Sequence, residues 1–125
     1  MINSILLYIG SGIIFIWGVA HLVPTKAVIA GMGQISEDNR RLLFMGWIAE
    51  GLTLCFIGVL VFLITWLTGP QNQASEIVYR ASYIMLALMA ALTSNTGART
   101  NIVPMKICPF VKITVAVLFL LGTIL

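Results

Sequence analysis

The chain has 125 residues, of which 60% are hydrophobic and 9% are charged, and its formal net charge is +3. An ordinary soluble domain has about 25% charged residues, so this composition excludes a water-soluble domain of any size. The basic residues form no run and lie at the ends of apolar segments, which is typical of membrane topology and argues against a nucleic-acid partner.

Four apolar segments predict an all-α, integral membrane four-helix bundle with short loops, formed by a single domain over residues 1–125. Each segment is long enough to cross a bilayer, which takes about 20 residues. We expect the longest connection between the first two helices. The expected helices cover residues 5–22, 37–68, 77–97 and 108–125.

The first helix is expected to end before Pro24, close to His21, the only histidine of the chain. A solvated imidazole at a helix C-terminus, favoured by the helix dipole, is one interpretation of His21. The other is a polar group that lines a ligand pocket. In the connection that follows, the apolar stretch AVIAGMG is too short to span and is expected in the interface or as a short helix.

The second helix is expected to begin after Ser36, a good N-cap followed by acids in the first turn. Glu50 lies about seven residues inside the apolar part of this helix, or roughly 10 Å deep. A carboxylate at a helix centre in a membrane costs about 2.5–3.5 kcal/mol. Glu50 is therefore either an interhelical tie or a functional group, with proton donor or acceptor as its candidate catalytic role.

The third helix ends in a polar cluster that contains Asn95 and Arg99, and a small-residue seam precedes it. Small residues let membrane helices approach closely. We expect Arg99 or Asn95 to be the direct partner of Glu50. In the fourth helix, Pro109 fits the first turn, and Lys112 is expected to reach outward toward the membrane surface.

The basic residues predict the orientation of the chain. Six of the seven lie in or beside two connections on one side of the membrane: Lys26, Arg40, Arg41, Arg99, Lys106 and Lys112. By the positive-inside rule, loops 23–42 and 98–108 should face the cytoplasm and both termini the opposite side. The expected location is a bacterial inner membrane or its equivalent.

This topology brings four polar residues to the cytoplasmic half of the bundle, and they are the candidate ligand-binding residues: His21, Glu50, Asn95 and Arg99. One histidine and two separated cysteines do not make a zinc site, so no metal is expected and no cofactor is obligatory. A haem held by His21 and a methionine is a weaker hypothesis than a bound quinone, because methionine also serves as apolar filler.

The motif Gly-x-x-x-Glu-Gly-x-x-Leu, here Gly46, Glu50, Gly51 and Leu54, resembles the second helix of the DoxX-like membrane proteins. The stretch LALMAALTSNTG over residues 86–97 is similar to the family's small-residue third helix. The resemblance implies a compact four-helix bundle. It also implies functions that range from a subunit of quinone-linked sulfur oxidation to assembly factors and cargo receptors.

Three functions follow as hypotheses. The first is binding of a lipophilic small molecule, such as a quinone or an isoprenoid-like compound, as part of or accessory to a membrane redox enzyme. The second is a structural or assembly role with a membrane protein partner, in which Glu50 is an interhelical tie. The third is a transporter or channel, which requires a homo-oligomer because four short helices enclose no pore.

Overall fold

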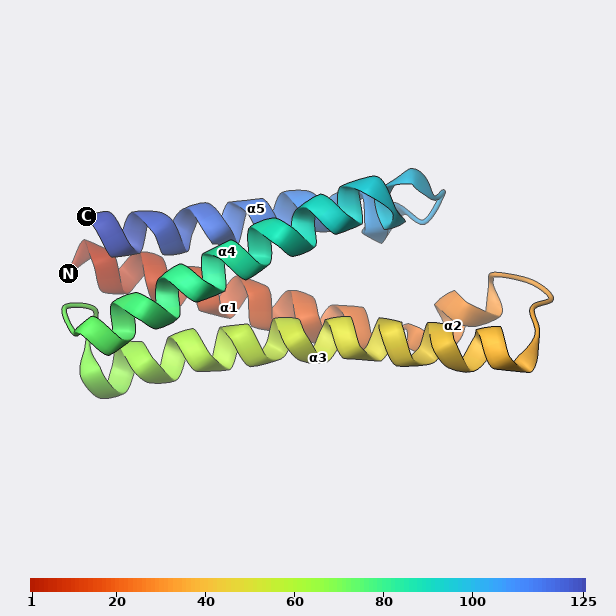
Figure 1. The fold of residues 1–125 in the computed structure, drawn as a ribbon, viewed down its shortest axis with the longest axis horizontal. Coiled ribbons are helices and arrows are strands. Elements are labelled where there is room, and N and C mark those ends of the chain that lie inside the picture. The colour runs from red at the N-terminus through yellow and green to blue at the C-terminus, as the bar shows by residue number, and fades with distance from the viewer.

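The computed structural model describes residues 1–125 and contains helices and no strands. Four long helices form the bundle in Figure 1, and two short helical segments lie in the connections. The all-α prediction is confirmed. The elements are α1 (Ile2–Leu22), α2 (Thr25–Ala30), α3 (Glu37–Thr68), α4 (Gln73–Asn95), the 3₁₀ segment η1 (Gly97–Arg99) and α5 (Val103–Ile124).

The four long helices, α1, α3, α4 and α5, are each long and apolar enough to cross a membrane. Their outward faces carry many exposed leucine, isoleucine, valine and phenylalanine side chains. Exposing these side chains to water would be unfavourable, whereas contact with lipid tails is not. The chain is therefore a small integral membrane protein, as its composition predicts.

The helices pair unequally. Helix α1 packs along both α3 and α5, and α4 packs mainly along α5, whereas α3 and α4 touch much less. Figure 1 shows why: α3 and α4 lie close near the turn that joins them and diverge toward the end where α2 lies. Both termini lie at the end where α3 and α4 meet. At the opposite end α3 and α4 are farthest apart.

The close packing of α1 on α3 depends on glycine. A Cβ atom added to Gly58 would lie 2.8 Å from the carbonyl oxygen of Ser11, and one added to Gly18 would lie 2.7 Å from Sγ of Cys55. Gly51 is similarly crowded by Leu22. These backbones are as near as small residues allow, which maximises van der Waals contact where no hydrophobic effect drives helix association.

The ends of α3 agree with the sequence prediction. The Ser36 hydroxyl accepts a hydrogen bond from the Asn39 backbone amide at 3.1 Å, and Glu37 and Asp38 occupy the first turn. Gly69, with φ of 77°, ends the helix in a conformation that favours glycine. Residues 27–30 of the apolar stretch AVIAGMG belong to the short helix α2 (Thr25–Ala30), and the rest of the stretch lies in the turn after it.

The other three long helices begin earlier than predicted, α1 by three residues, at Ile2. Helix α4 starts at Gln73, because Asn72 caps it by accepting a hydrogen bond from the Ala74 amide at 2.8 Å. Helix α5 starts at Val103 with Pro104 in its first turn, so Pro109 lies inside the helix and not at its start. Lys112 is consequently nine residues into α5, or about 13 Å along its axis.

Candidate functional site

Glu50 and Lys112 form an ion pair between α3 and α5. The Lys112 side chain is fully buried, and the Glu50 side chain is 25% exposed. The ammonium group also donates to Oγ1 of Thr93 on α4 at 2.7 Å, and that hydroxyl in turn donates to the Met89 carbonyl at 2.8 Å. A buried charge is tolerated only when it is paired and hydrogen-bonded in this way.

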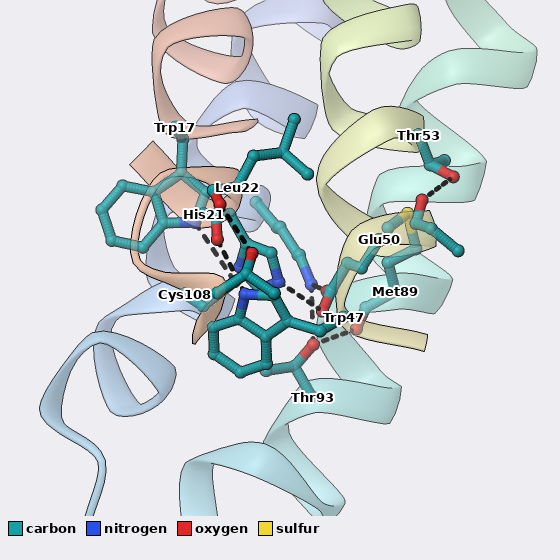
Figure 2. Close-up of polar contacts among 12 residues, drawn as sticks. Trp17, His21, Leu22, Trp47, Glu50, Thr53, Met89, Thr93 and Cys108 are labelled. Atoms are coloured by element: carbon teal, nitrogen blue, oxygen red, sulfur yellow. Dashed lines mark hydrogen bonds and ion pairs between the residues drawn. The ribbon is translucent and has the colours of Figure 1, made fainter. Parts of the chain in front are cut away.

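His21 joins the same cluster from α1. Its Nε2 atom lies 3.6 Å from Oε2 of Glu50, buried and without a hydrogen-bond partner. The imidazole stacks on the Trp47 indole with ring centroids 4.2 Å apart, and the Trp47 N–H donates to the His21 carbonyl at 2.7 Å. Figure 2 shows the His21 ring against the Trp47 indole, with a dashed line from the imidazole to Glu50. The carbonyl contact satisfies one acceptor that the end of α1 leaves open.

The cluster therefore takes one polar side chain from each long helix. The four residues are His21 of α1, Glu50 of α3, Thr93 of α4 and Lys112 of α5. We call them the ionic cluster.

A second contact between α1 and α5 lies one helical turn away from the ionic cluster. The Trp17 N–H donates to Sγ of Cys108 at 3.2 Å (Figure 2). Trp17 precedes His21, and Cys108 precedes Lys112, by four residues in each case, so each pair shares a helix face.

A cavity of about 340 Å³ adjoins the ionic cluster. His21 is the ionisable residue in its wall, and most of the rest is apolar. Small-molecule sites in proteins are typically pockets of about 300–1,000 Å³ with few polar groups in an apolar lining. The lining residues come from α1, α2, α3, α5 and the adjoining connections: Trp17, Ala20, His21, Pro24, Val28, Trp47, Pro104, Met105 and Ile107.

The structure brings together two of the four predicted site residues, Glu50 and His21, and leaves out the other two. Asn95 is exposed and donates to the Ala91 carbonyl at 2.9 Å. Arg99 is exposed in η1 and forms no ion pair. The expected pairing of Glu50 with Arg99 or Asn95 is wrong, because Lys112 takes that position.

The prediction that Lys112 reaches outward is also wrong, because it depends on a helix that begins at residue 108. The earlier start of α5 places Lys112 too deep for the side chain to reach the surface, and it turns toward Glu50 instead. Trp47 is a site residue that the sequence pattern did not single out. Its position three residues before Glu50 was the available signal, since such a pair shares one helix face.

The ionic cluster offers three chemical capabilities. Glu50 offers a carboxyl group and His21 an imidazole for proton exchange, Lys112 offers N–H donors, and Thr93 can relay a hydrogen bond. Since the cluster adjoins an apolar cavity, it could orient the polar end of a largely apolar molecule. It contains no set of side chains suited to a metal ion.

Comparison with family models, characterised proteins and solved structures gives no match. The likeness to DoxX-like proteins therefore stays a prediction from two short motifs.

Proposed function

We propose that this integral membrane protein binds a lipophilic small molecule, of the quinone or isoprenoid-like kind, in the cavity beside the ionic cluster. The observation that carries the proposal is the His21 imidazole in the wall of a largely apolar cavity, with Glu50 on its other side. An apolar ring or chain would fill the cavity, and its polar head would hydrogen-bond to His21.

Two tryptophans in the cavity wall make ligand binding measurable. Quinones quench indole fluorescence, and Trp17 and Trp47 both line the cavity. Trp66, the third tryptophan, is 68% exposed near the other end of α3 and would add background. In a Trp66→Phe protein in mild detergent, decylubiquinone is expected to quench the remaining fluorescence saturably, and farnesol to compete with it.

A pair of alanine variants tests whether the quencher occupies this cavity. Ala20→Phe places a ring in the cavity wall and should raise the Kd measured by quenching at least tenfold. Ala27→Phe adds the same ring on α2 outside the lining and should leave it unchanged. Equal affinity in both variants, with both folded, would show that the quinone merely partitions into the micelle, and the proposal would fail.

A structural role is the second candidate, and one specific observation favours it: the ionic cluster links all four long helices. In this case Glu50 serves folding or the docking of a membrane partner and no ligand is needed. Glu50→Gln separates the two roles. Under either proposal this variant should lower thermal stability, because Lys112 stays buried without its carboxylate. Saturable quenching by the quinone should weaken in the folded variant if the first proposal holds, whereas neither the wild type nor the variant should show it if the second does.

A further inference from the structure

A second hollow, distinct from the cavity beside the ionic cluster, lies between α2 and the first two turns of α3. This depression has a volume of about 420 Å³ and shares no lining residue with the cavity. It lies at the end of the bundle opposite the two termini, where α2 runs beside α3 in Figure 1. Its lining is Lys26, Ala30, Glu37, Arg40, Arg41 and Phe44.

The depression carries a surplus of positive charge. Three of its lining residues are cations, and the single carboxylate, Glu37, already lies 3.5 Å from Nε of Arg41. No acidic group lies within 4.0 Å of Lys26 or Arg40. Two cations from different helices therefore face one small space without a counter-ion from the chain.

The position along α3 places this charge at the membrane surface. Helix α3 has 32 residues and is about 48 Å long, whereas the hydrocarbon core is about 30 Å thick. Arg40 and Arg41 end its polar first turns, and the next outward-facing side chains, Leu42 and Met45, are 60% and 65% exposed. The step from cations to exposed apolar side chains marks the level of the lipid headgroups.

We propose that this depression binds the phosphate group of an anionic membrane phospholipid. Arg40 suits a phosphate because its guanidinium can donate two parallel hydrogen bonds, and Lys26 adds a point charge. Phe44 and Ala30 supply an apolar side for the glycerol and the first acyl carbons. A lipid fits better than a soluble phosphate, because the depression opens at the lipid surface and has this apolar side.

The proposal is tested with protein in mild detergent and a mixture of phosphatidylglycerol and phosphatidylcholine, with the bound lipids counted by native mass spectrometry. The wild type should prefer phosphatidylglycerol. The double variant Lys26→Gln/Arg40→Gln should bind it about 25-fold more weakly, since each cation near a membrane surface contributes about fivefold to anionic lipid binding. Phosphatidylcholine binding should not change.

The matched control removes two cations from the connection between α4 and α5 and from the start of α5. Arg99→Gln/Lys106→Gln has the same net charge as the test variant but leaves the depression intact. If both double variants lose the same affinity for phosphatidylglycerol, the preference arises from the overall charge of the protein and the proposal is wrong. Retained preference in the test double would also overturn it.

Two additional measurements distinguish a bound lipid from a soluble anion and from a folding defect. Displacement of the lipid by millimolar inorganic phosphate would assign the depression to a soluble anion and overturn the lipid assignment. If the test double does not fold, Ala30→Asp places a carboxylate in the depression without removing a cation, and Ala27→Asp places one outside it. Only Ala30→Asp should lose phosphatidylglycerol.

Discussion

At the residue scale, the main feature is Lys112, a charged side chain that is fully buried between the helices. A lysine at depth in a bilayer is costly on its own, and here the ammonium group finds a carboxylate and a hydroxyl within hydrogen-bond reach. The Glu50 side chain is 25% exposed, whereas the Lys112 side chain is fully buried. The lysine of the pair is therefore enclosed by protein, and the carboxylate is partly accessible from outside the bundle.

Removing the lysine should cost more than removing the whole pair. Lys112→Met leaves Glu50 without its cation, and loss of one partner from a buried pair costs about 3–5 kcal/mol. Adding Glu50→Gln removes the uncompensated charge and should recover at least half of that loss. Detergent unfolding of the two single variants and the double variant measures the coupling. Additive losses would mean that the pair contributes nothing as a pair.

At the scale of the elements, the α1–α3 contact is the most closely packed, and the glycines permit it. The added Cβ at Gly58 would meet backbone, the carbonyl oxygen of Ser11, so the clash cannot be relieved by a side-chain rotation alone. Gly12, also between these helices, has no heavy atom within 4 Å of an added Cβ. Both are glycines within long helices, but only Gly58 has no room for a Cβ atom.

These two glycines give a matched pair of alanine substitutions. Gly58→Ala should push α1 away from α3 and lower the stability by about 1–3 kcal/mol, as overpacking usually does. Gly12→Ala should be neutral or slightly stabilising, because alanine favours the helix over glycine. Thermal unfolding in one detergent compares them. A similar loss at both sites would show that glycine matters here for the helix and not for its packing.

At the scale of the whole molecule, the all-α class, the four spans and both ends of α3 could be predicted from hydropathy and capping residues. The partner of Glu50 could not. Composition identifies Glu50 as a costly residue that needs compensation, but the identity of the compensating group depends on helix rotation and on where α5 begins. The start at Val103 changes Lys112 from a residue near the membrane surface into a core residue.

The orientation of the whole chain is a prediction from its charges, and it can be measured. In a background with Cys55→Ala and Cys108→Ala, single cysteines are placed at Gln34, in the connection between α2 and α3, and at Gln71, in the turn before α4. A membrane-impermeant maleimide applied to intact cells should label Gln71→Cys. Gln34→Cys should react only after the membrane is opened. The reverse pattern would invert the assigned topology.

The pairing of Glu50 with Lys112 also has a consequence for biosynthesis. The two residues are separated by 62 positions, which a ribosome takes roughly 3–12 s to translate at roughly 5–20 residues per second. During that interval the carboxylate of α3 has reached the membrane and its counter-charge on α5 has not. A chain stalled after α4 would therefore present an uncompensated acid to membrane quality control, and the arrival of α5 ends that vulnerability.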